Sequence, residues 1–169
     1  MSQNAYTRPR QNAGLQRMPQ NQKEWTQFQN ELYKNRTGSF TPTFGGFDGS
    51  VTSGDVFWTI HNNTLATIKF PNFSGTSDAV TCEITNWPVF LCSWIVQSVI
   101  IGSFKDNSAT STEFGWVVIP QHPDNGGSAT PSVKFGLGAD NPTGGGFTAS
   151  NDKGLLIGTG VHCTYSIIG

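Results

Sequence analysis

The sequence predicts an all-β protein: a jelly-roll-like two-sheet β-sandwich preceded by an extended N-terminal arm and one short N-terminal helix. Three observations predict this class. Charged residues make up only 12% of the 169 residues, whereas 20 Gly, 19 Thr, 15 Ser and 9 Pro disfavour a helical bundle. Aromatic residues reach 12%, too many for a wholly disordered chain. From Gly38 onward, apolar and polar residues alternate with the period of two that is typical of strands.

The predicted arm covers residues 1–20, which contain no acidic and few large apolar residues and could not fold alone. Residues 1–36 hold six basic and two acidic residues, a net charge of +4, whereas residues 37–169 hold four lysines and nine acidic residues, a net charge of −5. This asymmetry indicates either a solvated tail or a docking arm that seeks an acidic surface or nucleic acid. The residues that would dock are Arg8, Arg10 and Arg17. The basic residues are too sparse to predict nucleic-acid binding.

A short amphipathic helical unit is predicted over residues 21–36, with the helix itself at 21–34. Asn21 can cap it, and Glu24 three positions later completes a capping-box pattern. The spacing i, i+3, i+7 places three apolar residues on one face: Trp25, Phe28 and Leu32. A helix of about 14 residues is too short to be stable alone. Its apolar face therefore packs either on its own β domain or against copies of itself around a symmetry axis.

The β-sandwich body is predicted over residues 37–169. Its candidate strands are 39–44, 54–60, 64–70, 79–85, 96–104, 114–119, 131–136, 154–158 and 161–168. In the clearest of them, Val80, Cys82 and Ile84 alternate with polar residues. The connections are rich in Gly, Asn, Asp and Pro, as turns are. Residues 87–95, WPVFLCSWI, are the most apolar run, and they predict either a fully buried strand or an exposed wall that contacts a neighbouring subunit.

The cysteines are predicted to be buried free thiols. Their number is odd, no secretory signal precedes them, and no CxxC or paired-His spacing suggests zinc. We therefore expect no cofactor and no metal. The sequence also has no apolar stretch long enough to cross a membrane.

Nothing in the sequence predicts an active site. His61, His122 and His162 each stand alone, and His122 precedes Asp124 in a Pro-rich turn. The only two glutamates of the body, Glu83 and Glu113, are not brought together by any pattern that glycoside hydrolysis would need. We therefore expect a protein that is not an enzyme. Sugar stacking is an alternative use of the four tryptophans of the body, Trp58, Trp87, Trp94 and Trp116.

Two stretches resemble small structural proteins of tailed bacteriophages. EWTQFQNELYKNRTGSFTPTFGGF (residues 24–47) looks like the helix-to-strand entry of phage fibre and capsid-appendage domains. FPNFSGTSDAVTCEITNWPVFL (residues 70–91) looks like their recurrent strand, GTS turn, strand and Pro element. Together the two stretches cover about a quarter of the chain. The long shaft of true fibres is missing.

The resemblance implies a non-enzymatic virion protein, usually a homotrimer with a jelly-roll-like body. Trp25, Phe28 and Leu32 would then meet their copies near the three-fold axis, and the arm would dock on a capsid or tail protein. The compact body favours a cement protein that decorates the capsid at the virion surface. The alternative is a short tail or head fibre, or a lectin-like module that binds host-surface glycans.

Overall fold

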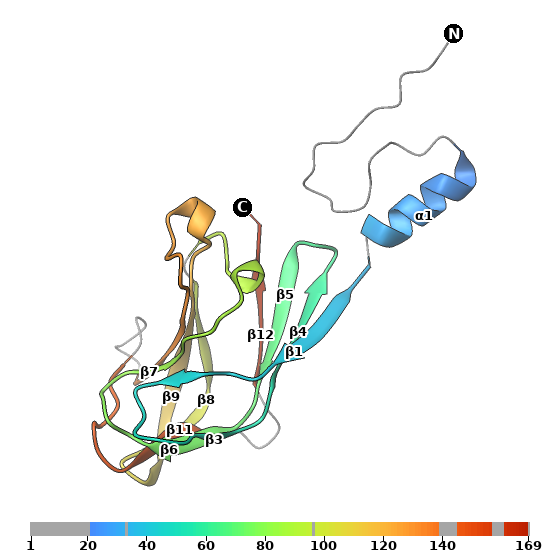
Figure 1. Cartoon of the computed structure of the whole chain (residues 1–169). Helices are drawn as coiled ribbons and strands as arrows, with labels where there is room; N and C mark the ends of the chain where they lie inside the picture. Colours follow the sequence, from blue (N-terminus) through green and yellow to red (C-terminus); the bar gives the residue numbers. More distant parts are fainter. Residues whose placement is uncertain (1–20, 33, 96, 139–144, 157–160, 169) are drawn as a thin grey trace.

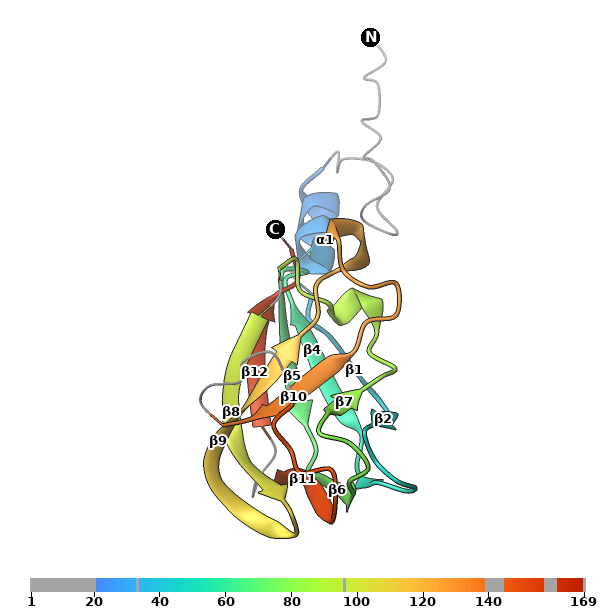
Figure 2. The same cartoon turned by 90° about the vertical axis from the view of Figure 1, so that its left-hand side faces the viewer.

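The computed structural model describes residues 21–32, 34–95, 97–138, 145–156 and 161–168. These residues form two antiparallel sheets that face each other, and one α-helix beyond one end of them (Figures 1 and 2). The predicted all-β class, with a sandwich-like body and a short N-terminal helix, is confirmed. The predicted arm lies outside the described residues, with Arg8, Arg10 and Arg17.

The smaller sheet has the strand order β1-β4-β5-β12. Its strands are β1 (Arg36–Phe40), β4 (Val56–His61), β5 (Leu65–Phe70) and β12 (Val161–Ser166). Residues 62–64 join β4 to β5, and two of them, Asn62 and Asn63, have positive φ values of 52° and 58°. Turns of this kind match the twist of a hairpin, and asparagine tolerates them. The hairpin therefore ends in a tight tip.

The larger sheet has the strand order β2-β7-β10-β9-β8-β11-β6-β3. Its strands are β2 (Phe44–Gly45), β3 (Thr52–Ser53), β6 (Phe73–Thr76), β7 (Cys82–Ile84), β8 (Gln97–Asp106), β9 (Ala109–Ile119), β10 (Val133–Leu137) and β11 (Asp152–Leu156). The hairpin of β8 and β9 is the longest pair and forms its centre. Lys105 on β8 and Asp152 on β11 form an ion pair of 3.0 Å, which holds the pKa of that aspartate below its usual value.

The core lies between the two sheets and is rich in aromatic rings. Phe70 of the smaller sheet meets the edge of Phe135 of the larger sheet, with ring centroids 5.5 Å apart. Phe73 and Phe104 pack against the same Phe135 ring. All three cysteines are free and buried, as predicted: Cys82, Cys92 and Cys163. Burial of such large rings provides most of the stabilisation of a sandwich.

Several predicted strand boundaries are wrong, for local reasons. The predicted strand 39–44 is divided into β1 and β2 around Pro42, which has no N–H to donate to a ladder. The strand β6 was not predicted, since its FSGT sequence has little apolar alternation. Strand β7 begins only at Cys82, so Val80 lies outside it and is 56% exposed.

The apolar run 87–95 is not a strand. After Pro88 the chain forms a single 3₁₀ turn, η1 (Val89–Leu91), and then continues as a loop. Trp87, Leu91 and Cys92 are buried, whereas Val89 and Phe90 are exposed. The run is thus part core and part exposed surface, and its contact with a neighbouring subunit stays a prediction.

The helix α1 (Gln22–Leu32) has the predicted start. The Glu24 amide donates to the Asn21 side-chain oxygen at 2.9 Å, which is the expected N-cap bond. Both views show α1 beyond the end of β1, pointing away from the sheets (Figures 1 and 2). Packing of α1 on its own β-sandwich, one of the two interpretations, is therefore not observed in the described residues.

Candidate functional site

The helix α1 carries the predicted self-association face. Its Trp25 is described and is 42% exposed. The side chains of Phe28 and Leu32 lie outside what the structure describes, although both residues fall within the bounds of α1. The helix therefore has the geometry that the i, i+3, i+7 spacing of these apolar residues requires. What their common face contacts stays a prediction.

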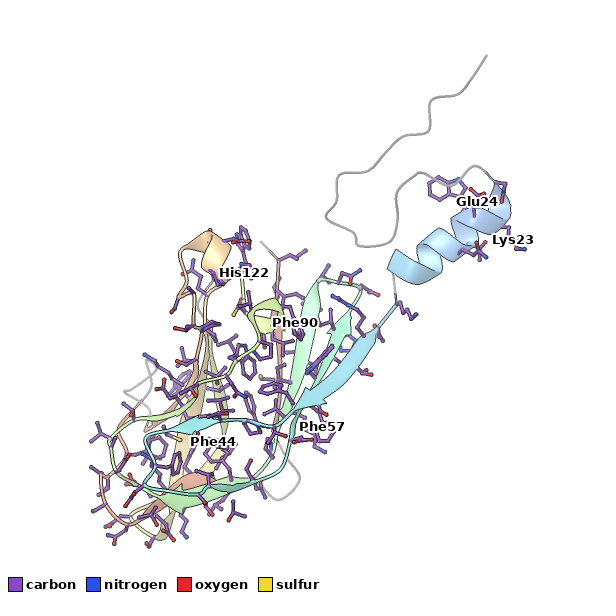
Figure 3. The ribbon with its side chains drawn as sticks, viewed as in Figure 1. Lys23, Glu24, Phe44, Phe57, Phe90 and His122 are labelled. Carbon is purple, nitrogen blue, oxygen red and sulfur yellow. The ribbon has the colours of Figure 1, made fainter. Side chains whose placement is uncertain are left out.

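A cluster of exposed apolar side chains lies at the end of the body from which α1 departs. We call it the apolar end. Its members are each 38–60% exposed, and they are Leu65, Val89, Phe90, Trp94, Ile95 and Ile168. They come from the β4–β5 hairpin, from η1 and the loop after it, and from the segment after β12, which gather at one end of the body in Figure 1. Figure 3 shows Phe90 and His122 at this end and Phe57 farther along the body.

Hydrogen bonds hold these segments together. The Ile167 amide donates to the Thr64 carbonyl at 2.9 Å, which places the last residues of the chain beside Leu65. The buried Ser93 hydroxyl donates to the Ser166 carbonyl at 2.8 Å, which joins the loop after η1 to β12. The apolar end is therefore assembled from segments far apart in sequence.

The two aromatic rings of the apolar end, Phe90 and Trp94, also pack against other rings of the body. Phe90 packs edge-on against the half-buried Trp58, with centroids 5.1 Å apart. Trp94 stacks on the His122 ring at 6.3 Å, and its carbonyl accepts a hydrogen bond of 2.7 Å from the Asn125 side chain. Rings that are fixed in this way cost less conformational entropy when a partner binds them.

Part of this cluster could be found in the sequence. The aromatic residues of the run 87–95 are visible in the sequence, but which of its positions are buried and which are exposed depends on the 3₁₀ turn. Ile168 comes two residues after Ser166, so it lies on the same outward-facing side of the chain as the polar residues of β12. Leu65 gave no signal beyond its place at the start of a strand.

The tryptophans of the body differ in exposure. Trp87 is buried, and Trp116 donates its indole N–H to the Gly138 carbonyl at 3.0 Å. Trp94 is the exposed one of the four, at 38%. A row of exposed tryptophans for sugar stacking is thus not formed.

A buried lysine was not predicted. Lys153 on β11 has no exposed surface, and its ammonium donates to the Ala79 carbonyl at 2.7 Å and to the Thr81 carbonyl. The same group lies over the Phe47 ring, 4.8 Å from its centroid. Burial lowers the pKa of this lysine. These contacts connect β11 to the segment before β7, so the role of Lys153 is structural.

Two further candidate residues, His122 and Glu83, make hydrogen bonds within the body. The Nδ1 atom of His122 accepts a hydrogen bond from the Asp124 amide at 3.2 Å and so caps the 3₁₀ turn η2 (Pro123–Asn125). Glu83 accepts from the Ser132 hydroxyl at 2.8 Å. Among the described residues, no three His, Cys, Asp or Glu side chains are grouped so as to hold a metal ion. The helix that the structure describes is too short and too polar to cross a membrane.

No protein-family model matches the chain, and a search of the curated proteins found no match.

Proposed function

We propose that the protein is a non-enzymatic structural subunit, a homotrimeric cement protein that decorates the capsid of a tailed-phage particle. The observation that carries the proposal is the apolar end: six exposed apolar side chains gather where α1 leaves the body. The resemblance of residues 24–47 and 70–91 to phage appendage proteins supports the choice of particle.

Exposed apolar area at one end favours self-association. Six side chains at 38–60% exposure amount to roughly several hundred Å², as large as the largest apolar patch of a typical monomer, and patches of this size often mark interaction sites. Helix α1 has 11 residues, fewer than the ~12–15 that even favourable isolated helices need. Both elements gain stability when they are covered.

The charge distribution supports docking through the arm. The net charge of residues 1–36 is +4, and that of the body is −5, so the arm is attracted to acidic surfaces while the body is repelled from them. Joining three arms in one trimer raises the avidity for a particle without any new contact. The proposed docking residues remain Arg8, Arg10 and Arg17.

Deletion of residues 1–20 tests this function. We expect the shortened chain to stay folded and trimeric, because both the core and α1 lie after residue 20, but to lose attachment to the particle. Light scattering of the full chain should give about 55 kDa, three times the chain mass of 18.3 kDa. Sedimentation with the purified particle measures attachment. Normal attachment of the shortened chain would contradict the docking role, and a monomeric full chain would contradict the proposed trimer.

A further inference from the structure

We infer that the apolar end of one copy receives helix α1 of a second copy, so that the subunits exchange their N-terminal helices. This inference rests on the proposed function, in which the protein is an oligomer. It names the surface that α1 contacts, whereas the proposed function requires only that the copies associate. The interface would join Trp25 of one copy to the side chains around Trp94 and Ile95 of the next.

The position of α1 favours a second copy over the same chain. Only residues 33–35 separate α1 from β1, and α1 continues outward from that strand (Figures 1 and 2). Strand β1 is one edge of the smaller sheet, and β12 is the other edge. Leu65 on β5 lies two strands away from β1 in this sheet, and Ile168 follows β12, the strand farthest from β1. A helix that points away from its own apolar end is presented to a neighbour.

The size of the surface fits a helix from another subunit. The apolar end alone exposes several hundred Å² of apolar area. A stable interface buries roughly 800 Å² on each partner. A helix of 11 residues is about 16 Å long and adds its own apolar face. In a cyclic trimer each copy buries its apolar end against one neighbour and its α1 against the other, so both surfaces contribute to the area that each copy buries.

The charges of the two surfaces are complementary. The segment 21–36 holds Lys23, Lys34 and Arg36 against two glutamates, and the basic arm precedes it. The body is acidic, and at the apolar end the η2 turn presents Asp124, whose side chain is 84% exposed. Opposite charges at the rim of an apolar contact favour the correct partner and speed association.

A charged substitution at the apolar end tests the contact. We expect Ile95→Asp to raise the dissociation constant of the full-length oligomer at least about tenfold, because it places a carboxylate in a buried apolar contact. The matched control is Val80→Asp. Val80 is 56% exposed and Ile95 is 60% exposed, and Val80 lies in the segment before β7, away from this end. Sedimentation equilibrium measures both constants, and far-UV circular dichroism checks that each variant is folded.

Cross-linking between two different chains tests the exchange itself. One chain carries Gln22→Cys, one helical turn before Trp25, and the other carries Ile95→Cys; a short bismaleimide is added after mixing and re-equilibration. We expect a cross-linked dimer of the two different chains. The control is Lys23→Cys in place of Gln22→Cys. Lys23 lies on the side of α1 opposite Trp25, so this variant should give little cross-linked dimer. The natural cysteines are buried, so they react slowly in the folded chain.

The outcomes separate the two proposals. If the trimer stays intact with Ile95→Asp, or if no cross-link forms between the two different chains, the helix exchange is overturned. The proposed oligomer is not contradicted by either result. A full-length chain that is a monomer overturns both. If Ile95→Asp fails to fold, the cross-linking result decides.

Discussion

The single buried lysine shows how a polar residue can stabilise an apolar core. Lys153 satisfies two backbone carbonyls, those of Ala79 and Thr81, and its ammonium lies over the Phe47 ring. A hydrogen bond from a charged donor contributes about 1.5–3 kcal/mol, and the cost of burying the ammonium offsets part of it. No pattern in the sequence reveals this role, because a lysine beside a strand is usually solvated.

We expect Lys153→Met to lower the free energy of unfolding by about 2 kcal/mol, since the two carbonyls lose their donor. Lys134→Met is the control, because Lys134 is exposed on β10 and should change stability by less than about 0.5 kcal/mol. Urea denaturation of both variants measures the difference. Equal stability of Lys153→Met and the natural protein would mean that the cost of burying the charge cancels its hydrogen bonds.

The buried thiols and Tyr165 make stability depend on alkaline pH. Burial raises the pKa of Cys92 to about 11 and that of Cys163 to about 12, from 9.0, and it also raises the pKa values of Cys82 and Tyr165. Above about pH 9 the unfolded chain therefore releases protons that the folded chain keeps, so stability falls as the pH rises. Lys153 acts in the opposite sense, because its pKa is lowered in the folded chain.

Since four groups oppose one, we expect the free energy of unfolding to fall by about 2–4 kcal/mol per pH unit near pH 10, at roughly 1.4 kcal/mol for each proton. Urea denaturation under reducing conditions at several pH values measures this slope. Cys163→Ala removes one of these titrating groups, so it should make the slope smaller by roughly 1.4 kcal/mol per pH unit, the value for one proton. A slope that this variant leaves unchanged would show that Cys163 titrates alike in both states.

At the scale of elements, local patterns were informative where one residue controls the geometry. Asn21 marks the start of α1, and the Asn62-Asn63 turn joins β4 to β5. The alternation of β12 was also correct, with Cys163 and Tyr165 buried. Each of these features depends on contacts within a few residues of the chain, which the sequence contains.

Elements that depend on distant contacts could not be predicted. The loop after η1 is held by Ser93, which bonds to the Ser166 carbonyl 73 positions away, and by Tyr165, which donates to the Leu91 carbonyl at 2.5 Å. The apolar end exists only because these bonds bring η1 beside the β4–β5 hairpin and β12. Its aromatic members were visible in the sequence, whereas their common place on one surface was not.

At the scale of the whole molecule, the described residues form a body with a buried core and an N-terminal helix, α1, that lies outside this core. In the part of the chain that the structure describes, every residue of the buried core falls between Val56 and Tyr165, and every strand begins at or after Arg36. The N-terminal segment should therefore contribute to assembly and not to the folding of the body. Stability that comes from assembly depends on protein concentration, whereas stability that comes from the core does not.

We therefore expect a chain of residues 35–169 to fold as a monomer whose melting temperature is the same at low and high protein concentration. The full chain should melt at a temperature that rises with concentration, because its oligomer dissociates on unfolding. Thermal melts of both chains over a hundredfold range of concentration measure this difference. A shortened chain that remains trimeric would place the main contact within the body, and an unfolded one would mean that α1 is needed for the core.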